Sequence, residues 1–396
     1  MSGGKGPLEG VLVADFSRVV AGPFATMLLG DLGADVIKVE RPGAGDDTRG
    51  FGPPFVDGES SYYLSINRNK RGVAWDLGSE DGRRKARRLA ERADVVVENF
   101  RPGTAARFGL GYDEIAAANP RVVYCSVSGF GTTGAGASMP GYDFLLQAVG
   151  GLMSVTGDDG GEPRKVGVAV VDVLTAQFAA NAIIAALYER ERSGSGQRVE
   201  VNLLSCLLCA LINQASTYVT TGTVPRAMGN RHPSIAPYET LWAADRLLVV
   251  AVANDTQFAA FADALGLSWM TSDERFARNA ARVAHRGEML EVLQGELHHR
   301  PAAEWLPIIQ AAGIPCGIVN DIAQAFDLAE GLGLDPVVRL PRSGEPYSAA
   351  AGEPSGESQV RNPMGFSRTP ISYRLAPPGL GEHTTAVESE LGLDGG

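Results

Sequence analysis

The first 130 residues alternate short apolar runs with helix-like runs, and this alternation constrains the fold more than any other feature. Strand-like runs lie at 11–15, 35–39, 95–97 and 122–126, and helix-like runs lie at 23–32 and 83–93. A β-α-β rhythm with loops of a few residues predicts a parallel sheet covered by helices. Ligands of such sheets bind at the loops that follow the strands.

The rest of the 396-residue chain predicts further helices and a second unit. Helices are expected at 143–150, 174–190 and 203–222. Strand-like runs at 235–242 and 246–253 open the second unit, which continues with helices at 256–266, 285–298 and 302–312. The segment 343–361 is rich in Gly, Ser, Glu and Pro, which predicts a surface excursion.

Charge and composition exclude several classes of protein. The net charge of −11 argues against nucleic acid as the main partner, although residues 1–110 carry +1 and the remainder −12. An anionic ligand is therefore expected on the N-terminal part. The sequence contains no run of about 18 uncharged apolar residues, so no membrane helix is predicted. The residues after Met1 lack the apolar core of a signal peptide, so a cytoplasmic location is expected. Cys206 and Cys209 lie in an apolar helical segment, which favours core packing over metal or redox chemistry.

Basic side chains cluster at or near the expected strand ends. Arg guanidinium groups match phosphate oxygens, so a phosphorylated ligand would suit this cluster; ordinary surface ion pairing is the alternative. Its members are Lys38, Arg41, Arg49, Arg68, Lys70, Arg71, Arg101 and Arg107. Directly after the strand at 95–97, Phe100 could stack on an adenine ring and the Asn99 amide could bond it; the alternative is a turn Asn with a core Phe.

Asp172 is the leading candidate for chemistry. It follows the apolar run 166–171, interpreted as a strand, and opens the apolar helix 174–187. The N–H groups and dipole of a helix N-terminus favour an ionised carboxylate, which is how a fold would present a carboxylate nucleophile. The local alternative is an ordinary N-cap aspartate.

Three other residues are candidates for holding a substrate. Tyr142 precedes Asp143, and Gln147 lies one helical turn beyond Asp143, where a polar group could serve a nearby nucleophile. The alternative is a helix start capped by Asp143. His232 lies in a polar loop at 229–238. No metal-ligand spacing, Ser-His-Asp arrangement or dinucleotide fingerprint is present, so no metal is expected.

Motifs spread along the chain resemble the class III coenzyme A-transferases. They lie at 7–23, 32–43, 67–71, 93–103, 192–198, 313–317 and 381–384. The resemblance implies an α/β fold with a Rossmann-like large domain, a smaller α+β domain and an interlocked homodimer. The large domain would take residues 1–225 and 326–396 from both chain ends, and the small domain residues 226–325.

The resemblance also implies site residues. It makes Asp172 the nucleophile and acyl-CoA a substrate, with no tightly bound cofactor. The implied CoA contacts are Val19, Val20, Arg41, Asn99, Phe100 and Arg107. Formyl-CoA transferase carries Gln, Lys and Lys where this chain has Val20, Gly78 and Pro140, and a glycine-rich loop over its nucleophile is missing here. These departures argue against formyl or oxalyl transfer.

Segments 141–157 and 232–238 resemble the succinyl-CoA:glutarate branch of the family. The expected reaction moves CoA from an acyl-CoA, expected to be succinyl-CoA, to a carboxylic acid, expected to be dicarboxylic, through an aspartyl intermediate. The alternative is an α-methylacyl-CoA racemase of the same fold, but racemases carry His where this chain has Tyr142. A third reading, a non-catalytic CoA-binding protein, is opposed by Asp172 and its flanking motifs.

Overall fold

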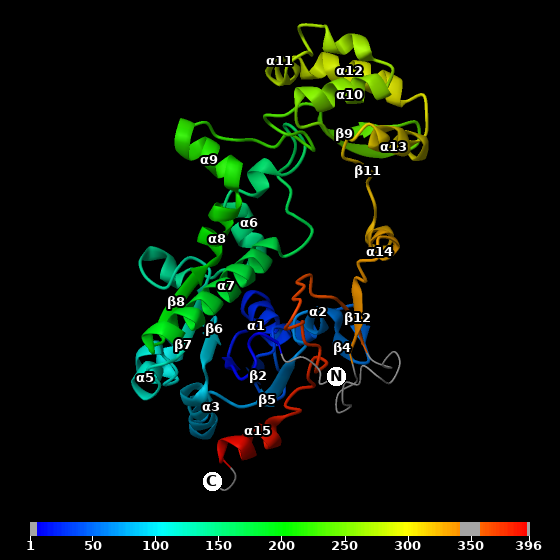
Figure 1. Ribbon diagram of the computed structural model, residues 1–396. Coiled ribbons are helices and arrows are strands. Elements are labelled where there is room, and N and C mark those ends of the chain that lie inside the picture. The colour runs from blue at the N-terminus through cyan, green and yellow to red at the C-terminus, as the bar shows by residue number, and fades with distance from the viewer. Residues whose placement is uncertain (1–5, 341–356, 394–396) are drawn as a thin grey trace. The chain divides into compact units, whose positions relative to one another are not determined.

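A computed structural model describes residues 6–340 and 357–393 of the chain. The chain forms two compact units (Figure 1). The first unit contains Met1–Leu152, Val166–Gly222 and Asp335–Gly396, and the second contains Met153–Lys165 and Thr223–Leu334. The domain ranges expected from the sequence stay predictions. Residues 343–356 of the expected surface excursion lie outside the described residues.

The first unit is built on a six-stranded parallel sheet. Its strands are β1 (Leu12–Asp15), β2 (Asp35–Glu40), β5 (Lys70–Ala74), β6 (Val95–Glu98), β7 (Val123–Ser128) and β8 (Gln197–Asn202), in the order β5-β2-β1-β6-β7-β8. The predicted parallel α/β class and four of these strands are confirmed. The sequence analysis missed β5 and β8, because both runs are rich in Lys, Arg, Gln or Glu side chains.

Helices cover both faces of this sheet (Figure 1). Val13 of β1 packs on one side with α1 (Ala21–Asp31), α7 (Val170–Ser193) and α8 (Leu203–Ala210). The next residue, Ala14, packs on the other side with α3 (Glu80–Arg92), α5 (Tyr112–Ala118) and α15 (Thr384–Leu391). This alternation follows from the two-residue period of a strand, and it gives the sheet an apolar core on each face.

The order of the strands creates a crevice between β1 and β6. From β1 the chain adds β2 and β5 on one side, and then it places β6, β7 and β8 on the other. In open parallel sheets the loops after the two central strands separate at this reversal, so ligands bind there, beyond the carboxyl ends. The loops that follow β1 and β6 carry Ser17–Val20 and Asn99–Arg101.

The segment before Asp172 departs from the prediction. Residues 166–169 form no strand, and α7 already begins at Val170. α7 is long and apolar enough to cross a membrane by length and composition alone, and 44% of its most apolar window is buried inside the protein. α8 and α9 (Ile212–Thr221) meet the same test only as one pair, which bends by 85°. A buried core helix passes this test too, so it is weak grounds for a membrane span.

The second unit has its own sheet and core. Its antiparallel strands are β9 (Tyr238–Trp242), β10 (Leu247–Ala251) and β11 (Cys316–Ile318), with helices α10 (Asp255–Ala264), α11 (Asn279–Ala284), α12 (Arg286–Leu297), α13 (Ala302–Ala311) and α14 (Ile322–Gly331). Phe258, Phe261, Phe276 and Trp305 dominate the core.

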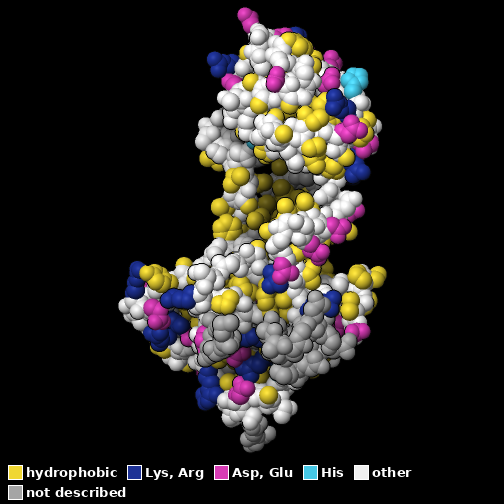
Figure 2. All heavy atoms as spheres, turned by 45° about the vertical axis from the view of Figure 1, so that its right-hand side comes forward, with side chains coloured by type: hydrophobic (Ala, Val, Ile, Leu, Met, Phe, Trp, Pro, Cys, Tyr) yellow, Lys and Arg dark blue, Asp and Glu magenta, His cyan; other side chains and the backbone are white. Residues whose placement is uncertain are grey.

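The remaining short elements belong to the first unit. They are β3 (Phe55–Val56), β4 (Glu59–Ser60), α2 (Ser61–Leu64), α4 (Thr104–Arg107), α6 (Asp143–Val149), β12 (Val337–Arg339) and β13 (Ser358–Val360). On the face drawn in Figure 2, hydrophobic side chains reach the surface among charged side chains of both signs.

Candidate active site

A cavity of about 430 Å³ lies at the crevice and brings together most of the site residues predicted from the sequence. Its lining includes Val19, Val20, Asn99, Phe100, Tyr142 and Asp172. A second cavity of about 260 Å³ is lined in part by Arg41, Trp75 and Phe100. Arg107 is exposed and lines neither cavity, and its guanidinium lies 5.4 Å from the Phe108 ring centroid.

Asp172 is partly buried in the first turn of α7, and the structure gives it no cationic partner among the described residues. Burial, followed by the neighbouring charge of Asp143, raises the pKa of Asp172 to about 7. Burial and Asp143 thus oppose the ionised form of Asp172, which the helix N-terminus was expected to favour. A carboxyl group in a cavity whose pKa is perturbed in this way is a candidate for a functional site.

Asp143 explains why the helix N-terminus does not serve Asp172. Asp143 Oδ1 accepts the backbone N–H of Val171 at 2.8 Å and that of Asp172 at 3.4 Å. The N-cap residue Ala169 supplies no side-chain cap. Asp143, from α6, thus caps α7 and takes the favourable end of its dipole. The two alternatives considered from the sequence do not form: Asp172 is not the N-cap residue of α7, and Asp143 does not cap its own helix, α6.

Gln147 supports this arrangement from behind. Its side chain is fully buried, and Nε2 donates to Asp143 Oδ2 at 2.7 Å. Gln147 Oε1 accepts the Val166 N–H at 2.8 Å, and Nε2 reaches the Val168 carbonyl at 3.3 Å. These bonds hold the loop formed by residues 166–168. The structure therefore places Gln147 as a support for Asp143 and for the entry to α7, while Tyr142 is exposed at the cavity.

The N-terminus of α1 borders the same cavity. The first N–H groups of a helix have no acceptor within the helix, and the side chain of the N-cap residue, Val20, supplies no cap to α1. Val20 and Ala21 line the cavity together with Asp172. N–H groups at a helix N-terminus can stabilise a developing oxyanion.

Gly129 and Gly141 also line this cavity. Their backbones lie so close together that a Cβ on Gly141 would lie 2.4 Å from the Gly129 Cα.

The Asn99 side chain is occupied by the protein itself. Asn99 Oδ1 accepts the Arg18 N–H at 2.9 Å, and Nδ2 donates to the Arg18 carbonyl at 2.8 Å. The Asn99 side-chain amide was a candidate for hydrogen bonding to adenine. In the structure its two hydrogen bonds instead join the loop after β6 to the loop after β1. Phe100 is partly buried, contacts the Phe108 ring edge-on at 5.9 Å and lines both cavities.

Most of the expected phosphate-binding cations are instead held in ion pairs, and three of them, Lys38, Arg68 and Lys70, are buried. Lys38 binds Asp46 at 2.8 Å and Lys70 binds Asp15 at 3.1 Å, with all four side chains inaccessible to solvent. Arg49, Arg68 and Arg71 pair with Glu40, Asp31 and Asp35. Arg41 is exposed and pairs with Asp47 at 2.9 Å. Sequence could not reveal the partners of Arg68, Lys70 and Arg71, because those partners lie 37, 55 and 36 residues away.

Two residues at the site were missed by the sequence analysis. Arg18 lines both cavities, and its only sequence signal was its place in the loop after the first strand. Tyr62 lies on α2, and its ring contacts Phe51. Burial, and then the charges of Asp172 and Asp143, raise the pKa of Tyr62, so its hydroxyl lies within electrostatic range of both carboxylates. Nothing in the local sequence signals that proximity.

Other candidates lie elsewhere. His232 belongs to the second unit, where its Nδ1 accepts the Ser234 N–H at 3.1 Å and its ring lies 5.3 Å from that of Tyr238. Cys206 is buried on α8 as expected for core packing, but Cys209 is exposed. Within residues 6–340 and 357–393, no group of three His, Cys, Asp or Glu side chains is arranged to hold a metal ion.

These features define a parallel α/β protein with a partly buried carboxyl group of raised pKa in a cavity at the switch point of its sheet. Residues 8–384 match CoA-transferase family III. The chain is 41% identical over 393 residues to a protein of Agrobacterium fabrum named succinate–glutarate CoA-transferase, covering 98% of this chain and 96% of the relative. An Acetobacter aceti protein named acetyl-CoA:oxalate CoA-transferase is 40% identical, with 82% of this chain and 84% of the relative covered.

A solved structure described as a CAIB/BAIF family protein from Brucella suis superposes with a TM-score of 0.85 at 39% identity, covering 98% of this chain and all of that one. The chain belongs to CoA-transferase family III, and it is an enzyme that uses acyl-CoA as a substrate. The predicted family resemblance and enzyme class are confirmed.

Proposed function

We propose that the enzyme transfers CoA from succinyl-CoA to a free dicarboxylic acid, with Asp172 as the covalent nucleophile. The observation that carries this proposal is the Asp172 carboxyl, which has no cationic partner among the described residues and lies in the same cavity as the N-terminus of α1. The name of the Agrobacterium relative supports the choice of a dicarboxylic substrate pair.

The chemistry proceeds by exchange between anhydrides and thioesters. The Asp172 carboxylate attacks the thioester carbonyl carbon, the C–S bond breaks, and a mixed anhydride and CoA thiolate form. The thiolate then attacks the aspartyl carbonyl, which releases the donor carboxylate and leaves an aspartyl-CoA thioester. The acceptor carboxylate attacks this thioester to form a second anhydride, and returning thiolate frees Asp172 and the new acyl-CoA. Covalent catalysis divides one hard transfer into easier steps.

The groups around Asp172 have matching tasks. Each tetrahedral intermediate carries an oxyanion, and the N–H groups at Val20 and Ala21, which line the same cavity as Asp172 and have no intrahelical acceptor, would stabilise it. Asp143 and Gln147 position the start of α7 and act through Asp172. Tyr142, which lines the cavity, and Tyr62, whose hydroxyl lies within electrostatic range of Asp172, would contact the acyl groups. The acceptor contact of His232 stays a prediction.

The CoA molecule would occupy both cavities. The adenine would lie in the smaller cavity against Phe100, with Arg41 at its wall, and the pantetheine arm would lead to Asp172 in the larger one. Val19 and Val20, in the loop after β1, and Asn99, in the loop after β6, would contact the pantetheine arm. Arg107, which is exposed on α4, would meet a phosphate from outside. No tightly bound cofactor or metal enters this scheme.

Oxalate belongs among the acceptors to be tested. Val20, Gly78 and Pro140 argued against oxalyl transfer, whereas the name of the Acetobacter relative argues for it. We therefore propose a dicarboxylic acceptor without choosing its chain length.

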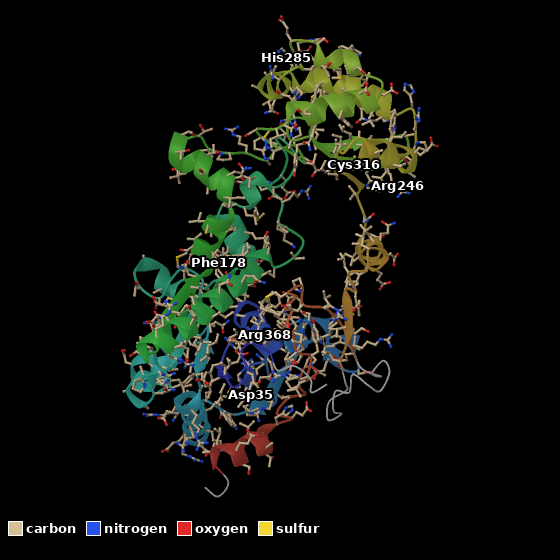
Figure 3. All side chains as sticks on the ribbon, in the orientation of Figure 1. Asp35, Phe178, Arg246, His285, Cys316 and Arg368 are labelled. Atoms are coloured by element: carbon tan, nitrogen blue, oxygen red, sulfur yellow. The ribbon has the colours of Figure 1, made fainter. Side chains whose placement is uncertain are left out.

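We also propose an interlocked homodimer, located in the cytoplasm, with no nucleic-acid or membrane partner. In each unit, helices leave apolar side chains uncovered. α9 buries none of its residues and exposes Ile212, Tyr218 and Val219, and α14 likewise buries none and exposes Ile322. Phe178, labelled on α7 in Figure 3, is also exposed. Apolar faces of this kind are typical of surfaces covered by a partner.

A CoA-exchange assay tests the reaction. Purified enzyme is mixed with succinyl-CoA and a panel of acids (glutarate, malate, itaconate and oxalate), and the acyl-CoAs are identified by mass spectrometry. A new dicarboxylyl-CoA is the expected result. Deuterium uptake at Cα of a branched acyl-CoA, without CoA exchange, would show that the enzyme is a racemase and not a transferase. If neither CoA exchange nor deuterium uptake occurred, CoA binding without catalysis would be the remaining function.

A further inference from the structure

Two side chains, Arg18 and Phe100, are common to the linings of both cavities. A CoA molecule whose adenine lies in the smaller cavity and whose thioester reaches Asp172 must pass this junction. The part of CoA between its adenosine and its pantetheine arm is a diphosphate, and Arg18 is the cation at the junction. We propose that Arg18 binds the diphosphate of CoA; this inference rests on the proposed function.

Side-chain hydrogen bonds fix the backbone of residues 17–19, around Arg18. Arg18 exchanges two hydrogen bonds with Asn99. The preceding carbonyl, of Ser17, accepts from Lys38 Nζ at 3.1 Å, and the following N–H, of Val19, lies 3.3 Å from each Asp46 carboxylate oxygen. Three consecutive residues are thus held by side chains from the loops or strands around them.

Val19 shows that this clamp works against a conformational preference. Its φ of 68° lies in the left-handed region, which costs a β-branched residue about 1–3 kcal/mol. Such strain persists where the surroundings over-determine the backbone, and it clusters at ligand-binding sites. Here Asp46, which is buried and paired with Lys38, holds the Val19 N–H. The strained conformation fixes the point from which the Arg18 side chain leaves the loop.

Among the described residues, Arg18 and Arg41 together pair with only one carboxylate, that of Asp47. Arg18 lies 3.3 Å and Arg41 2.9 Å from different oxygens of Asp47, so two guanidinium groups share one carboxylate. The two arginine side chains are 43% and 55% exposed. Unlike the buried Lys38 and Lys70, they can turn toward a ligand without breaking a desolvated ion pair. Guanidinium groups bind phosphate oxygens through paired, charge-assisted hydrogen bonds.

Shortened substrates test the assignment, because they separate the phosphates of CoA. Initial rates are measured with succinyl-CoA, with succinyl-dephospho-CoA, which lacks only the 3′-phosphate, and with succinyl-pantetheine, which lacks all phosphates. Arg18→Gln should raise KM for the first two about 10- to 100-fold, as expected for loss of a charge-assisted bond, and should leave kcat/KM for succinyl-pantetheine unchanged. Arg18→Lys should recover part of the loss, because the charge remains without the fork. Arg87→Gln, at an exposed pair on α3, is the matched control and should change none of the values.

Three outcomes would overturn the inference: no change with any substrate, an equal loss with all three, or a loss confined to succinyl-CoA, which would assign Arg18 to the 3′-phosphate. Calorimetric titration with free CoA and free dephospho-CoA gives the same comparison without turnover. If the wild type transferred no CoA, the proposed function would fail, while the titrations would still decide whether Arg18 contacts the diphosphate.

Discussion

Asp15 and Asp172 lie in the same unit, and the fold treats these two carboxyl groups in opposite ways. Asp15 is completely buried and is bound by Lys70 at 3.1 Å, by Thr26 Oγ1 at 2.6 Å and by Ser17. Burial alone would raise its pKa, but the charges of Lys70 and Lys38 hold it below the ordinary value. Asp172 has no such cations, and its nearest charged neighbour is another carboxylate, so its pKa rises.

The difference separates a structural carboxylate from a reactive one. The Asp15 network ties the end of β1 to β2 and β5 through paired buried charges, whose removal would leave uncompensated charge. The Asp172 carboxyl has no cationic partner among the described residues, which costs stability and is common at functional sites. The predictions below test this contrast, beginning with the largest expected effect.

Replacing Asp172 should abolish catalysis without harming the fold. Asp172→Asn should lower turnover by at least about a thousandfold, because the nucleophile is lost, while CoA affinity changes little. The melting temperature at pH 7–8 should rise, since the ionised carboxyl is held unfavourably. Asp113→Asn, at an exposed position on α5, is the control and should alter neither value. Retained turnover in Asp172→Asn would remove this residue from the mechanism.

Replacing Lys38 should harm the fold before it harms the chemistry. Lys38→Met leaves Asp46 buried without its cation, which should lower the free energy of unfolding by about 3–5 kcal/mol in urea titrations. Arg84→Met, at an exposed ion pair on α3, should cost less than about 1 kcal/mol. Equal losses in the two variants would show that the buried network contributes no more than surface charge.

The pH dependence of the reaction should report the Asp172 carboxyl. Because attack needs the ionised form, kcat/KM should rise about tenfold per pH unit below pH 7 and then level off. The stability linkage has the opposite sign: the folded pKa is raised above the unfolded value, so this group's contribution falls as pH rises from about 4 to about 7.

Asp143→Asn should move the acid limb of that profile to lower pH, because one cause of the raised pKa is removed while burial remains. The helix cap should lose less than about 1 kcal/mol, measured by thermal unfolding, because Asn caps a helix about as well as Asp and only the charge at the helix N-terminus is removed. A profile identical to that of the wild type would show that Asp143 does not influence Asp172.

The sequence predicted the parts of this account that depend on local pattern. Apolar runs with short loops predicted β1, β2, β6 and β7, and the family motifs predicted Asp172 at the site. The same local reasoning placed a strand at 166–171, because an apolar run alone does not distinguish a strand from a loop held by Gln147.

The electrostatics of the site depend on residues far apart in the chain and could not be predicted in this way. Asp143, 29 residues before Asp172, takes the N–H groups that Asp172 was expected to use. Lys70 was expected to face a ligand, but its partner Asp15 lies 55 residues away on another strand. Arg18 gains its role only where two loops and two cavities meet.

The most direct test of the central claim is the detection of CoA bound covalently to Asp172. The enzyme is incubated with succinyl-CoA in the absence of acceptor, quenched in acid, digested and analysed by peptide mass spectrometry. The account predicts that the peptide containing Asp172 gains the mass of one CoA less one water, with release of succinate, and that Asp172→Asn shows no such gain. An adduct on another residue, or exchange of CoA with no adduct at all, would contradict it.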